Sequence, residues 1–130
     1  MKGFVCGSWD LLHAGHIILL SQCKLYCDDL VVGLHVNPQS EREGKNKPTQ
    51  SIYERTLQLR GCKYVDKIIV YETEEELKTI LRSSGIDIRF LGSDYDGTKD
   101  ITAEDAVPIK YLERCHNYSS TELKERIKNG

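Results

Sequence analysis

Short apolar, β-rich runs alternate with helix-forming segments along almost the whole chain, and this alternation limits the fold more than any other feature. Runs of this length and composition are typical of strands. The predicted strands are Lys2–Cys6, Asp29–Val36, Lys67–Tyr71, Asp87–Leu91 and Val107–Leu112. Alternating strands and helices favour an α/β fold, here a Rossmann-like, doubly wound, parallel five-stranded sheet with right-handed crossovers and helices on both faces.

Helix signals fill the intervals between most of these strands. The first helix is predicted from about Gly15 to Tyr26, where apolar residues recur at helical spacing. Three later helices begin with a hydroxyl residue followed three positions on by glutamate, which is the capping-box pattern. These pairs are Ser51 with Glu54, Thr73 with Glu76, and Ser119 with Glu122. The polar stretch from residue 39 to residue 50 is predicted to be a loop.

Length and composition restrict the class of protein. A chain of 130 residues suits one continuous core, so we expect residues 1–130 to form a single domain. The net charge is -2, and no basic stripe indicates nucleic acid or an anionic membrane as partner. The first residues resemble neither a signal peptide nor a transit peptide, and no stretch could span a bilayer, so a cytoplasmic location is expected. Five scattered cysteines fit reduced, mostly buried thiols.

Polar residues are concentrated where the predicted strands end. The segments GSWD, HVNP, GSDYDG and RCHNYSST follow the first, second, fourth and fifth strands. In open α/β sheets the ligand lies at the carboxyl ends of the strands, at the point where strand order reverses. We therefore expect these four segments to meet at one edge of the sheet and to form the binding site.

The strongest local signal is GSWDLLHAGH, residues 7–16, where a strand turns into a helix. A helix amino terminus favours phosphate oxygens, because its backbone N–H groups are unpaired and its dipole is positive there. His13 and His16 add directed N–H donors, and Gly15 allows phosphates to approach the backbone. The alternatives are a zinc pair and ordinary capping histidines. A zinc site would need further close ligands, so the residues favour a triphosphate site.

The same decapeptide resembles the [TS]-[FW]-D-x-x-H-x-G-H signature of the small cytidylyltransferases. The similarity extends over nearly the whole chain and is strongest to the glycerol-3-phosphate cytidylyltransferases, within the HxGH nucleotidyltransferase superfamily. CKYVD at residues 62–66 resembles the family's RYVDE element, and GSD at residues 92–94 its G-x-D turn. RCHNYSST at residues 114–121 resembles its R-T-x-G-I-S-T-[ST] segment.

The resemblance implies a role for each matching residue. His13 and His16 match the histidines that contact the triphosphate and stabilise the transition state, and Lys47 and Arg114 are the other catalytic candidates. Basic residues near the loop, Lys45 or Lys47 and Arg55, match phosphate-binding positions, and Lys63 matches an arginine for the acceptor phosphate. The remaining candidates for binding the nucleotide or acceptor are Gly7, Ser8, Trp9, Asp10, Gly15, Gly92, Asp94, Ser119, Ser120 and Thr121.

Two departures from the family pattern leave the substrates open. A lysine at position 63 is a point charge and does not reproduce the two-pronged contact of arginine with a phosphate, so the acceptor need not be the family's. The segment at residues 114–121 keeps the arginine and the hydroxyls but lacks the threonine after the arginine and the glycine. The choice of nucleobase therefore depends on the resemblance, whereas the phosphate site also follows from the residues themselves.

The expected reaction is transfer of CMP from CTP to a small phosphorylated acceptor, with release of pyrophosphate. An acceptor phosphate is already anionic at neutral pH, so the protein must align the reactants and offset negative charge. Mg²⁺ is expected on the triphosphate, with Asp10 as a candidate ligand. Glycerol 3-phosphate is the first choice of acceptor; phosphocholine, phosphoethanolamine, another polyol phosphate and a phosphonate are alternatives. A homodimer is also expected.

Three other functions fit parts of the pattern. An adenylyltransferase would share the HxGH core, because that core does not select the base. A nucleotide-binding module without turnover would keep the same residues. A structural zinc domain would use the histidines as ligands.

Overall fold

The computed structural model describes residues 1–38, 47–92 and 107–130. Strands and helices alternate in them much as the sequence predicts. The strands are β1 (Lys2–Gly7), β2 (Asp29–His35), β3 (Lys67–Tyr71), β4 (Ile88–Gly92) and β5 (Ile109–Leu112). The helices are α1 (Ala14–Lys24), α2 (Ile52–Arg60), α3 (Glu74–Ser83) and α4 (Ser120–Asn129).

The strands form one parallel sheet in the order β3-β2-β1-β4-β5. The strand order reverses at β1, whose two neighbours are β2 and β4. The predicted α/β, doubly wound fold is therefore confirmed. A ligand is expected at the carboxyl end of β1, beside the carboxyl end of β4.

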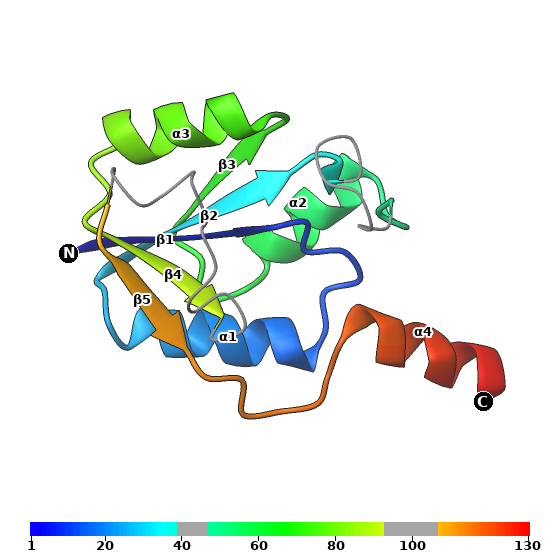
Figure 1. Cartoon of the computed structure of the whole chain (residues 1–130). Coiled ribbons are helices and arrows are strands. Elements are labelled where there is room, and N and C mark those ends of the chain that lie inside the picture. The colour runs from blue at the N-terminus through cyan, green and yellow to red at the C-terminus, as the bar shows by residue number, and fades with distance from the viewer. Residues whose placement is uncertain (39–46, 93–106) are drawn as a thin grey trace.

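Helices cover both faces of the sheet (Figure 1). The larger core packs α1 and α2 against one face and includes Leu20, Leu30 and Leu59, which are fully buried. The smaller core packs α3 against the other face, with Phe4 and Leu77 at its centre. The inner strand β2, between β1 and β3, is buried along almost its whole length, which explains why its sequence is a continuous apolar run.

The helix starts lie where the capping signals place them. Ser51 and Glu54 form a complete capping box at α2, in which each side chain accepts a backbone N–H of the other residue. Ser119 caps α4 by accepting from Glu122 N, as expected. Thr73 caps α3 by accepting from Glu76 N, but the Glu76 carboxylate accepts from Glu72 N instead of closing the box. The three N-caps are therefore confirmed, but of these three helices the reciprocal bond is present at α2 and not at α3 or α4, where the Glu122 carboxylate pairs with Arg126 instead.

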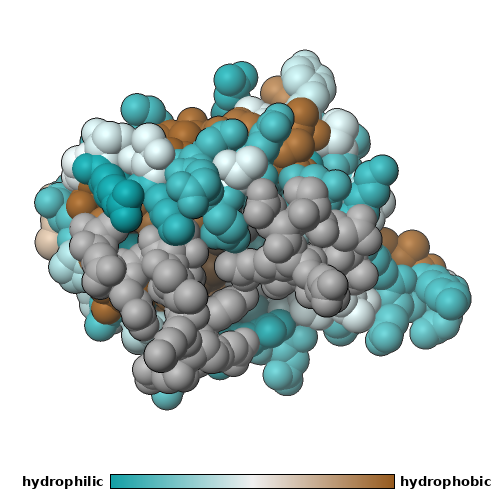
Figure 2. Space-filling model, turned by 45° about the horizontal axis from the view of Figure 1, so that its top comes forward, coloured by the Kyte–Doolittle hydropathy of each residue, from teal (hydrophilic) through white to brown (hydrophobic). Residues whose placement is uncertain are grey.

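Helix α4 projects from the body of the molecule (Figure 1), and none of its residues is buried. Figure 2 shows hydrophobic surface on this projection, where Ile127 is 71% exposed. None of the helices in the described ranges has the length and apolar character needed to cross a bilayer. All five cysteines are free, and Cys23, Cys27 and Cys62 are buried, in agreement with the predicted reduced thiols.

Candidate functional site

Two adjoining cavities open at the carboxyl edge of the sheet. The first has a volume of about 380 Å³ and the second about 280 Å³. They share Leu19, Gly92 and Ser120 in their walls, so they meet beside the strand-order reversal. The polar segments that follow β1, β2 and β5 line these cavities together with Gly92 at the end of β4. The predicted convergence of strand ends is thus observed for the described residues.

The connection from β1 to α1, residues 8–13, has a strained backbone. Trp9 and Leu11 adopt φ angles of 53° and 50°, in the left-handed region that bulky side chains rarely occupy. Two contacts hold them there: Trp9 Nε1 donates to Gly33 O at 2.9 Å, and Leu11 N donates to Gln50 Oε1 at 2.8 Å. Trp9 is buried in the larger core and lines neither cavity. The prediction that Trp9 borders the nucleotide is therefore corrected: its indole anchors the turn.

His13 and His16 form a capping box at the start of α1. His13 Nδ1 accepts from Gly15 N at 3.0 Å, and His16 Nδ1 accepts from His13 N at 3.2 Å. The two rings stack with centroids 3.9 Å apart, and the Trp9 ring lies 5.3 Å from that of His16. Both histidines line the second cavity. The capping interpretation is therefore confirmed, and the same two rings line the cavity in which we predict the triphosphate.

The capping bonds also fix the protonation of the two imidazoles. Because each Nδ1 accepts a hydrogen bond, the neutral ring carries its proton on Nε2. Burial, reinforced by the neighbouring His13, lowers the pKa of His16 to about 3. Burial first, then His116 and Arg114, also lowers the pKa of His13. At neutral pH the pair is uncharged and keeps its Nε2–H groups as donors.

Gly15 leaves room for two imidazole rings, which is a reason for a glycine in addition to the predicted one. A Cβ at this position would lie 2.7 Å from His116 Cε1 and 2.8 Å from His13 Cε1. The space above the helix start is thus filled by two imidazoles. Gly15 also lines the second cavity, and close approach of phosphate to its backbone stays a prediction.

Asp10 joins the turn to the polar segment before α2. Its carboxylate accepts from Thr49 N at 2.8 Å and from Gln50 N at 2.9 Å, while Lys124 Nζ lies 4.0 Å away. These bonds hold residues 47–50 beside the first cavity, which Lys47 and Asp10 both line. Asp10 thus positions the segment that carries Lys47, and its role as a metal ligand stays a prediction.

Arg55 does not face a ligand, which corrects its predicted role in phosphate binding. The side chain is 2% exposed, and its guanidinium donates to the backbone carbonyls of five residues. These are Ser8 and His35 (Nη1), Val36 (Nη2), and Gln50 and Ser51 (Nε). Burial lowers the pKa of Arg55 from its usual value. Arg55 therefore ties together the ends of β1 and β2 and the start of α2.

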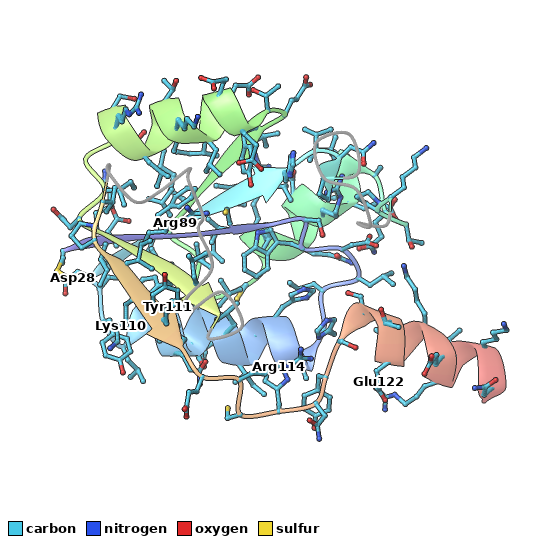
Figure 3. The ribbon with its side chains drawn as sticks, viewed as in Figure 1. Asp28, Arg89, Lys110, Tyr111, Arg114 and Glu122 are labelled. Atoms are coloured by element: carbon cyan, nitrogen blue, oxygen red, sulfur yellow. The ribbon has the colours of Figure 1, made fainter. Side chains whose placement is uncertain are left out.

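The connection from β5 to α4, residues 113–119, forms the outer wall of the second cavity. Arg114 is exposed; its Nε donates to His116 O at 3.1 Å and its Nη2 donates to Tyr118 O. It lies below α1, near the start of α4 (Figure 3). Ser119 is the cap of α4, and Ser120 Oγ donates to Asp10 O at 3.1 Å. Arg114, Ser119 and Ser120 line the second cavity, and Ser120 and Thr121 line the first.

The remaining predicted residues fall into three groups. Gly7, Ser8 and Gly92 line the first cavity, as expected. Lys45 and Asp94 lie outside the described residues. Lys63 is not brought to the site: it precedes β3 at the amino edge of the sheet, its Nζ lies 5.2 Å from the Tyr64 ring centroid, and nearby Asp66 N bonds to Leu30 O. The prediction that Lys63 contacts the acceptor within this chain is therefore corrected.

Three residues of the first cavity were missed by sequence reasoning. Lys124 follows Ser120 by four positions, so the helical spacing could have placed it on the same face. Arg89 interrupts the apolar run IRFL, and a charged residue inside a predicted buried strand indicates a position with a function beyond packing. Tyr71 ends a strand at the carboxyl edge. His35, whose role the sequence left undecided, stacks on Tyr71 with centroids 4.7 Å apart.

Metal binding by protein side chains alone finds no support in the described ranges. Within them, no group of three or more His, Cys, Asp or Glu side chains could hold a metal ion. The Nδ1 atoms of His13 and His16 accept backbone hydrogen bonds, so a zinc ion would have to bind at Nε2 and find its other ligands elsewhere. The geometry therefore fits neutral donors facing an anion better than a zinc centre.

Comparison with known proteins gives concordant matches. A model of the family described as cytidylyltransferase-like matches residues 4–126. The chain is 35% identical to glycerol-3-phosphate cytidylyltransferase of Bacillus subtilis (strain 168) over 97% of its own length and 96% of that protein's. It is 32% identical to the bifunctional protein HldE of Wolinella succinogenes, over 98% of its own length but 27% of that protein's.

Among solved structures, the lipopolysaccharide core biosynthesis protein of Thermoplasma volcanium GSS1 is similar, with a TM-score of 0.68 and 26% sequence identity. The match covers 92% of this chain and 98% of that one. The same fold thus recurs over almost the full length of both chains.

Proposed function

This chain belongs to the cytidylyltransferase-like family and is a nucleotidyltransferase, and we propose that it transfers CMP from CTP to a small acceptor similar to glycerol 3-phosphate. The observation that carries this proposal is the capping box of His13 and His16. It leaves two neutral imidazoles, each protonated on Nε2, in the wall of a cavity at a helix amino terminus. Such a site is suited to the oxygens of a polyphosphate.

The reaction needs no covalent enzyme intermediate. An anionic oxygen of the acceptor phosphate attacks the α-phosphorus of CTP, the new P–O bond forms, and the bond from the α-phosphorus to the bridging oxygen of the β-phosphate breaks. Pyrophosphate leaves with the bonding electron pair. Because the nucleophile is already ionised, catalysis requires alignment and stabilisation of the charge that develops on the phosphates.

The charged and polar side chains around the two cavities are arranged for this task. His13 and His16 are proposed to donate from Nε2 to oxygens of the triphosphate. Lys47 and Lys124 lie in the wall of the first cavity, where their charges would offset the negative charge of the leaving pyrophosphate and of the acceptor. Arg114, at the second cavity, is proposed to reach the nucleotide after releasing backbone carbonyls of its own loop.

Mg²⁺ is proposed to be bound chiefly by triphosphate oxygens. Among the described residues, Asp10 and Glu74 are the carboxylates that line the first cavity, and Asp10, although it holds two backbone amides, keeps further oxygen lone pairs. A magnesium ion there would neutralise phosphate charge and hold the chain of phosphates in a fixed geometry. The single domain, the homodimer and the cytoplasmic location stay predictions.

Initial rates of pyrophosphate release test the proposal directly. With Mg²⁺ and glycerol 3-phosphate, we expect CTP to give a kcat/KM at least about tenfold above those of ATP, GTP and UTP. A preference for ATP would instead support the adenylyltransferase alternative. Binding of CTP without product from any phosphorylated acceptor would indicate a nucleotide-binding module without turnover.

A further inference from the structure

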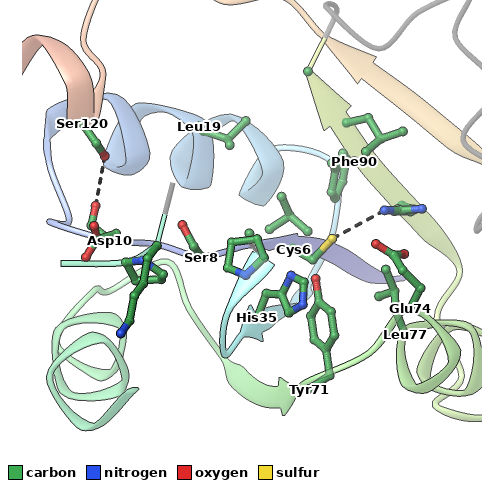
Figure 4. Close-up of a pocket in the computed structure, with 18 of the residues that line it drawn as sticks. Cys6, Ser8, Asp10, Leu19, His35, Tyr71, Glu74, Leu77, Phe90 and Ser120 are labelled. Carbon is green, nitrogen blue, oxygen red and sulfur yellow. Dashed lines mark hydrogen bonds between the residues drawn. The ribbon is translucent and has the colours of Figure 1, made fainter. Parts of the chain in front are cut away.

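The first cavity has a buried polar floor built from four neighbouring strands. We define the polar floor as Cys6 (β1), His35 (β2), Tyr71 (β3) and Arg89 (β4). His35 stacks on Tyr71, and Arg89 Nη2 donates to Cys6 Sγ at 3.5 Å. His35, Tyr71 and Arg89 are 5%, 4% and 1% exposed. Figure 4 shows Cys6, His35 and Tyr71 together on the side of the sheet that faces Glu74 and Leu77 of α3, and the hydrogen bond to Cys6 brings Arg89 to the same side.

Burial of the polar floor contributes little to the stability of the fold. Burial of a guanidinium among strands requires desolvation, and apolar residues of similar size would usually stabilise such a position as well or better. Its members nevertheless line the same cavity as Lys47, Ser120 and Lys124. A buried charge in the wall of a ligand cavity is better explained by what it binds than by the stability of the fold.

The two ends of the cavity differ in position relative to the sheet. Ser120, Thr121 and Lys124 of α4, with Lys47, surround the end next to the histidines. The polar floor lies on the opposite face of the sheet, where Cys6, Tyr71 and Arg89 neighbour the α3 core. A phosphate ester whose phosphate sits at the first end would extend its carbon skeleton past Gly7 toward the polar floor.

The chemistry of the polar floor selects among such skeletons. A guanidinium donates hydrogen bonds, and a phenol both donates and accepts. Burial, together with the neighbouring Cys6, raises the pKa of Tyr71, so its hydroxyl stays protonated. Hydroxyl groups of a ligand can satisfy this mixture. An ammonium group has no lone pair with which to accept from the Arg89 guanidinium, although the Glu74 carboxylate lines the same cavity.

Given the proposed function, we propose that Arg89 and Tyr71 set acceptor specificity, and that the acceptor is the phosphate ester of a small polyol. Its hydroxyl groups bind at the polar floor. Phosphocholine and phosphoethanolamine, which carry a cation at the corresponding end, are disfavoured there.

The test compares acceptors at saturating CTP and Mg²⁺, with pyrophosphate release as readout. We expect kcat/KM for glycerol 3-phosphate or a pentitol 5-phosphate to exceed that for phosphocholine by about 100-fold or more. In Arg89→Met, this ratio should fall at least about tenfold through a higher KM for the polyol phosphate, with the KM for CTP unchanged. Arg89→Lys should recover part of the ratio, because it restores the charge without the guanidinium fork.

Controls separate specificity from folding. Lys110→Met removes a cation on β5, where Lys110 lies over the Tyr26 ring and not in the cavity wall, so its acceptor ratio should equal that of the wild type. Tyr71→Phe removes a single hydroxyl and keeps the ring, so it tests the polar floor even if Arg89→Met lowers the thermal midpoint. Its ratio should fall by about threefold to tenfold.

The inference fails if the wild-type enzyme prefers phosphocholine or phosphoethanolamine, or if folded Arg89→Met and Tyr71→Phe leave the ratio unchanged. Calorimetric titration of each acceptor into protein loaded with a non-cleavable α,β-methylene analogue of CTP gives the corresponding ratio of affinities without turnover. A protein that binds polyol phosphates selectively yet releases no pyrophosphate would overturn the proposed function and leave the inference standing. Equal binding of all acceptors would overturn the inference alone.

Discussion

Two loops carry most of the residues assigned to the nucleotide, and they are held in opposite ways. The β1–α1 connection is tied to distant parts of the chain: Trp9 to Gly33, Leu11 to Gln50, and Asp10 to the amides before α2. The β5–α4 connection is exposed, and Arg114 holds it through carbonyls two and four residues further on. One loop is fixed by the fold and the other mainly by its own contacts.

This difference follows what each loop is proposed to do. Stabilisation of charge in a transition state needs donors that are already in position, and the strained turn with its buried anchors supplies such positions. Recognition of a nucleoside tolerates adjustment, because binding energy can reorder a loop on contact. The contrast predicts that substitutions at the first loop change stability or kcat, and that those at the second change KM.

The largest effect is expected from the first loop's support, in Arg55→Met. Loss of the guanidinium leaves several carbonyls at the ends of β1 and β2 without their donor, so the free energy of unfolding should fall by about 3–5 kcal/mol. Denaturant unfolding measures this. Arg60→Met, at the exposed end of the same helix, should change it by less than about 0.5 kcal/mol. A similar small change in both variants would show that the loop does not depend on Arg55.

The next effect concerns catalysis by the fixed loop. His16→Ala should lower kcat by about 100-fold or more, because the transition state loses a positioned donor. His16→Gln keeps a side-chain oxygen that can accept from His13 N, as glutamine does in ordinary capping boxes. Its thermal midpoint should therefore lie close to that of the wild type, while its kcat should fall as in His16→Ala. Full activity in either variant would remove the histidine from the mechanism.

A smaller effect is expected at the second loop. Arg114→Ala should raise the KM for CTP by about tenfold, change kcat by less than about threefold and leave the thermal midpoint nearly unchanged, because the side chain is exposed. Steady-state kinetics with varied CTP measure the split. A loss of kcat as large as that of His16→Ala would mean that both loops act on the transition state. It would contradict the proposed difference between the two loops.

The last effect is a dependence of stability on pH, which is smallest near neutral pH and grows as the pH falls. The pKa of His16 is about 3 in the folded protein and about 6.5 in an unfolded chain. The unfolded state therefore binds the extra proton first as pH falls, and stability contributed by neutral His16 is complete above pH 6.5 and is lost toward pH 3. Between these values the wild type should lose up to about 1.4 kcal/mol per pH unit more than His16→Gln, by denaturant unfolding. Parallel curves would contradict the depressed pKa.

Much of the fold could be predicted from local signals. Strand composition and the hydroxyl–glutamate pairs placed β3, β5 and the caps of α2, α3 and α4 within a residue or two, because strand composition and N-capping depend on nearby residues. The location of the site followed from the fold class, since parallel strands bring their carboxyl ends to one edge. His13 and His16 were found because their spacing and their place at a helix start coincide.

The errors concern side chains whose direction is set by tertiary packing. Arg55 and Arg60 lie five residues apart on one helix, and nothing local indicates that the first is buried against carbonyls and the second exposed. From the sequence alone, Trp9 could equally have covered a nucleobase. In the structure, the strained turn directs its indole toward β2, where it donates to Gly33 O. Lys63 matched a family position in sequence, but the α2–β3 connection lies at the amino edge of the sheet. Long-range contacts decide all three.

The two left-handed residues of the turn, Trp9 and Leu11, also bear on the order in which the molecule assembles. An isolated segment would avoid this backbone conformation, since bulky side chains disfavour it, and it becomes favourable after β2 and the start of α2 supply their partners. We expect the turn to reach its final shape late in folding, when most of the hydrophobic surface is already covered. The nucleotide site is then a product of the completed core, and a newly made chain gains its secondary structure before it gains a place for its substrate.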